Sequence, residues 1–192
     1  MAIGAAIVMG LLTVVDPHVR SDVPDLRALV ADGAERSATF SSLVDRLNDS
    51  DLVVYVEYAY WWSEHVDGCV TFISAAGGRR YVRVRIRWPL PRPRQLAMLG
   101  HELQHAVEIA GAPDVVDQAS LARFYRRGGS GTDWNFGRGV RFDTHDAVVT
   151  GLRVVKELGV RLTITKAKRS NALGALHNRH PVVEASPAGG IR

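Results

Sequence analysis

The chain has 192 residues, of which 46% are hydrophobic and 23% charged, with a formal net charge of +4. This composition is typical of one globular domain with a hydrophobic core, and it excludes a disordered chain or a repeat array. The single cysteine, Cys69, excludes an internal disulfide and a cysteine-based zinc site, so a metal site would have to use histidine and carboxylate ligands. The mildly basic charge comes without a nucleic-acid recognition module, so nucleic acid is not expected as a partner.

The first fifteen residues, MAIGAAIVMGLLTVV, are nearly all apolar. A helix needs about 20 apolar residues to cross a bilayer, so no stable membrane span is expected. The segment is similar to the apolar part of a signal peptide, but it lacks a basic leader and a clear cleavage site. We therefore interpret residues 1–20 as a signal-peptide-like segment, with a buried N-terminal strand or helix as the alternative. Export to the periplasm or medium and a cytoplasmic location both stay open.

The order of apolar patterns along residues 21–165 predicts a single α+β domain. The expected elements are two helical pieces within residues 22–48, strands at 52–60, 69–74 and 80–88, and helices at 94–110, 114–125 and 144–158. Short turns between the strands favour a small, mainly antiparallel sheet that packs on the helix at 94–110 and is followed by a helical C-terminal half. The basic, then Pro- and Gly-rich residues 166–192 are typical of a mobile tail.

Two of these elements carry a predicted buried face. In the strand at 80–88, the apolar residues that alternate with tyrosine and arginine are Val82, Val84, Ile86 and Trp88. They should pack on the core, while the arginines between them face solvent. In the last helix, the predicted buried stripe consists of Val148, Leu152, Val155 and Leu158.

The helix at 94–110 contains the sequence HELQH at residues 101–105. Side chains four residues apart lie on one helix face, so His101 and His105 can bind one Zn²⁺ ion from adjacent turns. Such an ion lowers the pKa of a bound water toward ~7, and Glu102 can accept the proton as this water attacks a carbonyl. The alternative is a solvated stripe of His and Glu on an ordinary helix.

His101, Glu102 and His105, together with the order of helix, sheet, motif-bearing helix and helical C-terminal half, resemble the zincin metallopeptidases. The likeness covers residues 22–158 in outline, and only the HELQH motif is specific. It implies a Zn²⁺ cofactor, a peptide or protein substrate, and a strand beside the active-site helix that pairs with extended peptide. By its order in the chain, the strand at 80–88 is the candidate for this strand.

A catalytic zinc ion normally has three protein ligands, and the third is left open here. The metzincin continuation, with Gly and His at fixed steps after the second His, is absent. Glu108 shares the histidine face, so it could bind the ion or accept a hydrogen bond from Nδ1 of His105. Asp143 precedes the last helix, where gluzincins and aspzincins have a downstream carboxylate, but Asp143 or Thr144 could simply cap that helix. Asp133, in GTDWNFG, is a weaker candidate.

Hydrolysis also needs a donor that stabilises the oxyanion of the transition state, and Tyr125 and His145 are the candidates. The predicted function is therefore a zinc-dependent hydrolase, most simply a metallopeptidase of a minimal gluzincin- or aspzincin-like form. One alternative is a catalytically inactive protein that keeps the zincin fold for binding. Another is a basic surface module, although alternating arginines more simply form a solvated face. These arginines are Arg79, Arg80, Arg83, Arg85 and Arg87.

Overall fold

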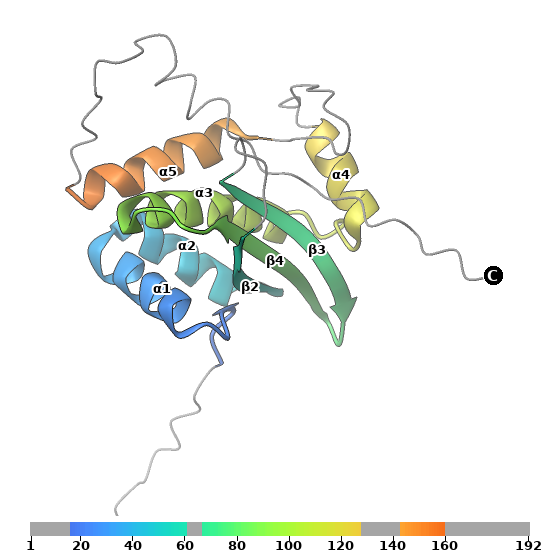
Figure 1. Cartoon of the computed structure of the whole chain (residues 1–192). Coiled ribbons are helices and arrows are strands. Elements are labelled where there is room, and N and C mark those ends of the chain that lie inside the picture. Colours follow the sequence, from blue (N-terminus) through green and yellow to red (C-terminus); the bar gives the residue numbers. More distant parts are fainter. Residues whose placement is uncertain (1–15, 61–66, 128–142, 160–192) are drawn as a thin grey trace, which may run out of the picture.

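A computed structural model of the chain describes residues 16–60, 67–127 and 143–159. The helices are α1 (Pro24–Arg36), α2 (Ala38–Asn48), α3 (Arg92–Ala110), α4 (Gln118–Arg127) and α5 (His145–Glu157). The strands are β1 (Val19–Arg20), β2 (Leu52–Ala59), β3 (Gly68–Ala76) and β4 (Arg79–Arg87). The sheet covers one side of α3, while α1, α2 and α5 pack along its other sides (Figure 1). The predicted α+β fold class is confirmed.

Three features predicted from the sequence fall outside these ranges. They are the apolar segment that precedes residue 16, Asp133 in the sequence GTDWNFG, and the predicted tail at 166–192. Within the described parts of the chain, no helix has the length and apolar character needed to cross a membrane.

The sheet is mixed, and its strand order is β1-β2-β4-β3. β2 pairs in parallel with both β1 and β4, and only the pair of β3 and β4 is antiparallel. The predicted mainly antiparallel sheet was therefore wrong. β3 and β4 form the antiparallel pair that the short turn between them favoured, and Gly77 and Gly78 in this turn have φ of 60° and 72°. The error came from treating β2 and β3 as neighbours, although β4 lies between them.

This strand order also corrects the prediction for the peptide-pairing strand. β4 is hydrogen-bonded along β2 on one side and along β3 on the other, so its backbone is occupied. Among the described strands, the two edges of the sheet are β1, which has only 2 residues, and β3, which begins at Gly68. An added peptide could pair only with such an edge strand.

The hydrophobic core lies between the sheet and α3. Its members from β2, β4 and α3 include Val54, Val56, Val82, Val84, Ile86, Leu96, Leu99 and Leu103. The alternation predicted for β4 is thus confirmed for its valines and isoleucine, whereas Trp88 is 40% exposed because it follows the last strand residue. Arg80 shares the inward face with Val82 and is buried, so its predicted place on a solvated surface was wrong.

The buried face of α5 matches the predicted stripe only in part. Val155 and Leu158 are buried as predicted, but Val148 is half-buried and Leu152 is 39% exposed. Ala147, Gly151 and Val154, which were not in the stripe, are buried. The reason is a close approach to α3: a Cβ at position 151 would lie 3.1 Å from the carbonyl oxygen of Ala97. The stripe was predicted from the large apolar residues of the helix. Where α5 approaches α3 most closely, however, only small residues such as Gly151 fit.

Candidate metal site

The HELQH sequence lies in the middle of α3, which runs for 19 residues from Arg92 to Ala110. His101, Glu102 and His105 are 7%, 0% and 1% exposed. A solvated stripe of polar side chains is therefore excluded. Buried polar side chains cost free energy unless they have partners or bind a ligand, so the neighbours of these three residues decide what they can do.

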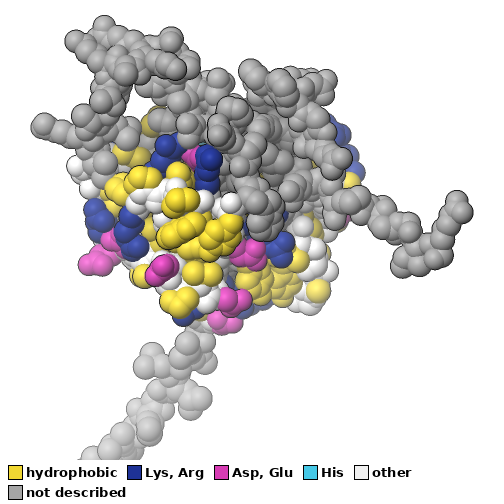
Figure 2. All heavy atoms as spheres, in the orientation of Figure 1, with side chains coloured by type: hydrophobic (Ala, Val, Ile, Leu, Met, Phe, Trp, Pro, Cys, Tyr) yellow, Lys and Arg dark blue, Asp and Glu magenta, His cyan; other side chains and the backbone are white. Residues whose placement is uncertain are grey.

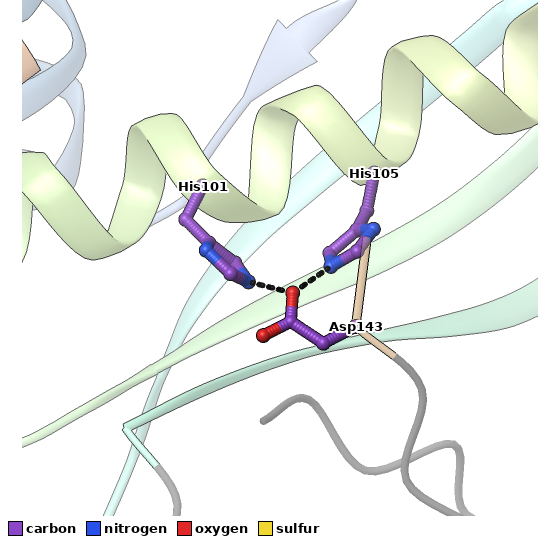
Figure 3. Close-up of side chains that lie close together, drawn as sticks. All are labelled: His101, His105 and Asp143. Atoms are coloured by element: carbon purple, nitrogen blue, oxygen red, sulfur yellow. Dashed lines mark ion pairs between the residues drawn. The ribbon is translucent and has the colours of Figure 1, made fainter. Parts of the chain in front are cut away.

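Asp143 directly precedes Thr144, the N-cap of α5, and its side chain lies close to both histidines (Figure 3). Its Oδ1 lies 3.4 Å from Nε2 of His101 and 3.8 Å from Nε2 of His105. One candidate ligand atom from each of the three residues lies within 4.8 Å of the others. Two atoms bound to one zinc ion at its usual bond lengths are about 3.4 Å apart in a tetrahedral site. The three side chains are therefore arranged closely enough to hold one metal ion.

Thr144, and not Asp143, caps α5. Its Oγ1 accepts a hydrogen bond of 3.1 Å from the backbone N–H of Ala147. From the sequence, Asp143 and Thr144 were equally suitable N-caps, because either side chain can accept a hydrogen bond from the first turn of the helix. Because Thr144 supplies the capping oxygen, the carboxylate of Asp143 is directed at the histidines, as its short distances to both rings show.

Glu108 lies behind His105 on the same helix. Its Oε2 is 3.0 Å from Nδ1 of His105, and its Oε1 accepts a hydrogen bond of 2.7 Å from the hydroxyl of Thr144. An ionised carboxylate only accepts, so this hydrogen bond requires a proton on Nδ1 of His105. In a neutral ring the lone pair is then on Nε2, the atom that faces Asp143. Of the two roles considered for Glu108, the geometry matches that of the hydrogen-bond partner of His105.

Glu102 is the most enclosed carboxylate of the cluster. Among the residues that the structure describes, neither of its carboxylate oxygens has a hydrogen-bond partner. The start of β3 lies directly against it, since a Cβ at Gly68 would come within 2.3 Å of Oε1. Burial, followed by the negative charges of Asp143 and Glu108, raises the pKa of Glu102 well above its usual range. A cation at the histidines would oppose this rise, because it favours the ionised form.

The two predicted oxyanion donors occupy different surroundings. Tyr125 is buried, its hydroxyl donates to the backbone carbonyl of His105 at 3.4 Å, and its ring contacts the His105 ring edge-on at 5.4 Å. Burial, with the charges of nearby carboxylates, raises the pKa of Tyr125 well above its usual range. His145 is the first residue of α5 and is exposed. The donor role of both residues stays a prediction.

Two contacts of the site were missed by sequence reasoning. Thr144 appeared only as a helix cap, yet its hydroxyl also binds Glu108, 36 residues earlier in the chain. Gly68 was not singled out, although its missing side chain leaves room for Glu102. The capping position drew attention to Thr144, although not to its contact with Glu108. A single glycine at the start of a strand does not indicate that a carboxylate packs against it.

The arginines of β4 do not form one basic surface. Arg83 pairs with Glu57 at 3.0 Å, Arg87 pairs with Asp67 at 3.2 Å, and Arg80 is buried. On the face drawn in Figure 2, basic, acidic and apolar side chains are interspersed. Paired and mixed charges of this kind give little support to the basic surface module considered above.

Comparison of the chain with protein-family models, curated proteins and solved structures gave no match. The likeness to zincins therefore depends on the HELQH motif, and the geometry around it is the main evidence on function.

Proposed function

We propose that the chain is a zinc-dependent hydrolase, most simply a metallopeptidase of the zincin type. His101, His105 and Asp143 would hold Zn²⁺, and Glu102 would act as general base. The observation that carries this proposal is the convergence of the two histidine Nε2 atoms on Oδ1 of Asp143, with a buried carboxylate one residue away on the same helix.

The donor set suits zinc. Two imidazoles and one carboxylate are ligands of catalytic zinc sites, which leave a fourth position open. Nε2 of His105 has no hydrogen-bond partner in the described part of the chain, so a cation there would offset the cost of burying it. The same ligands bind Fe(II) in oxygenases. The adjacent Glu102 favours hydrolysis, because a hydrolytic reaction needs a base beside the ion.

A bound zinc ion would supply Lewis-acid chemistry, polarising a carbonyl group and making a water molecule more acidic. The chain would supply the ligands, their orientation and the proton transfer. Glu108 fixes the ring of His105 through Nδ1. Glu102 would take a proton from the attacking water and return it to the leaving amine, which suits a carboxylate whose pKa is raised by burial.

An extended peptide is the substrate class that the surroundings of Glu102 favour. The first residue of β3, Gly68, lies against the Glu102 carboxylate, and β3 is an edge strand of the sheet. Edge strands bind extended chains through backbone hydrogen bonds. A peptide bond aligned along the start of β3 would therefore lie close to the general base.

The proposal is tested by assaying the protein on a broad peptide library with added zinc. Glu102→Gln keeps the shape of the side chain but cannot take a proton, so kcat should fall at least about 10²-fold while zinc content is unchanged. The exposed Glu35 on α1 offers a control, and Glu35→Gln should leave both quantities unchanged. Equal cleavage by the wild type and Glu102→Gln would refute the role of general base. Bound zinc without any cleavage would favour the inactive binding protein.

A further inference from the structure

The hydroxyl of Thr144 makes two hydrogen bonds with different consequences. It accepts from the N–H of Ala147 at 3.1 Å, which caps α5, and it donates to Oε1 of Glu108 at 2.7 Å, which lies on α3. A cap needs only the first of these bonds. The second joins the start of α5 to the helix that carries the histidines.

The second bond continues to a metal-site histidine. Glu108 accepts from Thr144 through Oε1 and from Nδ1 of His105 through Oε2, so one carboxylate receives both protons. The side chain of Glu108 is 15% exposed, and that of His105 is 1% exposed. Because the carboxylate is held at both oxygens in a largely buried place, it fixes the ring orientation and the Nδ1–H tautomer of His105.

The same residue also sets the position of Asp143. Asp143 precedes Thr144 directly, and its Oδ1 approaches both histidine Nε2 atoms. Fixing Thr144 on Glu108 therefore fixes the backbone next to Asp143 relative to His105. Two of the three candidate ligands are oriented through one hydroxyl group.

We propose that Thr144 is a positioning residue of the metal site, acting through Glu108 to hold His105 and the neighbouring Asp143 in the arrangement that binds metal. The proposal rests on the proposed zinc site. It predicts that loss of the Thr144 hydroxyl weakens metal binding beyond what the loss of a helix cap can explain.

The chain contains a matched control at Ser37. This residue caps α2 by accepting from the N–H of Phe40 at 3.0 Å, and its hydroxyl donates to Oε2 of Glu157 at 2.6 Å. Ser37 and Thr144 are thus both N-caps that donate to a glutamate of another helix. Only the glutamate bound to Thr144 contacts a candidate metal ligand.

The test is the zinc dissociation constant at fixed pH, measured by competition with a chromophoric chelator. Thr144→Ala and Glu108→Gln should each weaken zinc binding about tenfold or more, the usual effect of losing a group that orients a ligand. Combining them should weaken binding no more than the stronger single change, because both break one linkage. Thr144→Ser and Ser37→Ala should stay within about twofold of the wild type.

Thr144→Gly replaces Thr144→Ala if the latter does not fold, because glycine at an N-cap costs little stability and has no hydroxyl. Unchanged zinc affinity in the hydroxyl-free variant would overturn the proposal. So would additive effects of Thr144→Ala and Glu108→Gln, since two independent sites add.

A second measurement separates this inference from the zinc site itself. In metal-free protein, the ¹⁵N spectrum of neutral His105 should show the Nδ1–H tautomer, and Thr144→Ala should shift the population toward Nε2–H while Ser37→Ala does not. A wild type that binds no zinc would refute the proposed function. The spectrum would still show whether Thr144 orients His105 through Glu108. An unchanged tautomer in Thr144→Ala would overturn the link.

Discussion

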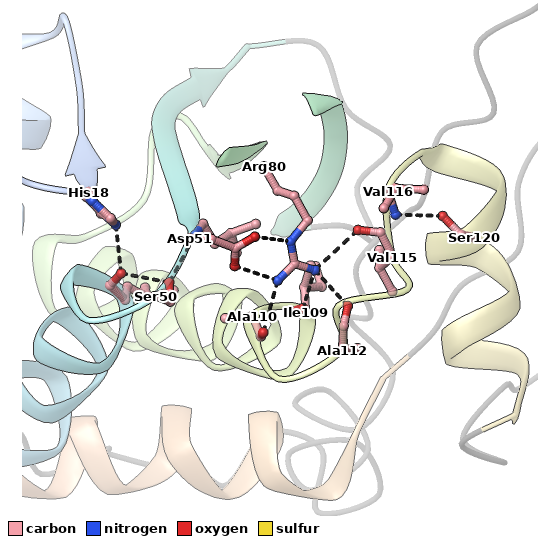
Figure 4. A network of polar contacts seen from close by, with 12 residues as sticks. His18, Ser50, Asp51, Arg80, Ile109, Ala110, Ala112, Val115, Val116 and Ser120 are labelled. Carbon is pink, nitrogen blue, oxygen red and sulfur yellow. Dashed lines mark hydrogen bonds and ion pairs between the residues drawn. The ribbon is translucent and has the colours of Figure 1, made fainter. Parts of the chain in front are cut away.

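Two polar clusters lie on α3, and they differ in how far their atoms are hydrogen-bonded. At the C-terminal end, Nε and Nη2 of Arg80 each donate to Asp51 at 2.7 Å (Figure 4). The remaining bonds of the same guanidinium go to carbonyl oxygens at the end of the helix and the turn after it, those of Ile109, Ala110, Ala112 and Val115. In this cluster the donors and acceptors are paired with one another, because the buried guanidinium donates to carbonyls at the helix end that have no partner within the helix.

The cluster in the middle of the helix, around His105 and Glu102, is not fully hydrogen-bonded among the described residues. Within the described ranges, both oxygens of Glu102 and Nε2 of His105 lack a hydrogen-bond partner. Burying such atoms costs free energy, and a fold keeps them where they bind something. The contrast indicates that the Arg80 cluster stabilises the helix, whereas the histidine cluster costs stability unless it binds a ligand, as we propose.

The largest effect on stability is expected at Arg80. Arg80→Met removes every hydrogen bond of a buried guanidinium and leaves Asp51 without its partner. The carbonyls of Ile109 and Ala112 keep a backbone donor, but those of Ala110 and Val115 lose the arginine. The free energy of unfolding should therefore fall by about 3 kcal/mol or more. Arg83→Met on the same strand removes an ion pair whose two side chains are 39% and 45% exposed, and it should cost at most about 1 kcal/mol. Urea unfolding of both variants measures the difference. Similar losses would contradict the contrast between a buried cluster and a surface pair.

A smaller loss of stability, with a specific loss of function, is expected at Gly68. In Gly68→Ala the added Cβ would lie 2.3 Å from Oε1 of Glu102, so the carboxylate or the start of β3 must move. Such overpacking costs about 1–3 kcal/mol, and hydrolysis should fall with it. Gly111→Ala is the control, because its Cβ would meet nothing closer than 3.6 Å. Wild-type activity and unfolding of Gly68→Ala would mean that Glu102 is not held against β3.

The smallest effect is the pH dependence contributed by Asp51. The hydrogen bonds from Arg80 lower the pKa of Asp51 below its usual value of 3.8. Its stabilising contribution should therefore be complete above that value and be lost as the pH falls through the lowered pKa. The side chain is 43% exposed, so solvent screening limits the contribution. The difference in unfolding free energy between the wild type and Asp51→Asn should shrink as the pH falls below 3.8. A difference that grows in acid would contradict this ion pair.

The parts of the site that could be predicted are those set by local spacing. His101 and His105 share a helix face because they are four residues apart, and this holds in any helix. The alternation in β4 also contained the signal for Arg80, which has the same parity as Val82. Residue type alone groups Arg80 with the surface arginines, whereas the alternation places it on the buried face.

The parts that could not be predicted depend on how distant elements meet. β4 lies between β2 and β3 because β2 pairs with β4 and not with β3, the other strand of the hairpin. Local sequence patterns do not determine this choice. The choice between Asp143 and Glu108 could not be made from the sequence, because either carboxylate is able to approach the histidines. The structure brings Asp143 to both Nε2 atoms and Glu108 to Nδ1 of His105. Only the packing of α5 on α3 determines this outcome.

The central claim is that the cluster around His105 and Glu102 on α3 is a metal site, and metal analysis of the purified protein tests it most directly. After passage over a chelating resin and reloading with zinc, the wild type should retain about one zinc ion per chain, since the site offers three candidate ligands. The double variant His101→Ala, His105→Ala should retain essentially none, with its metal-free fold intact by circular dichroism. Equal zinc in the wild type and the folded double variant would contradict the metal site. Iron in place of zinc in the protein as purified would contradict the assignment of zinc and leave the metal site itself standing.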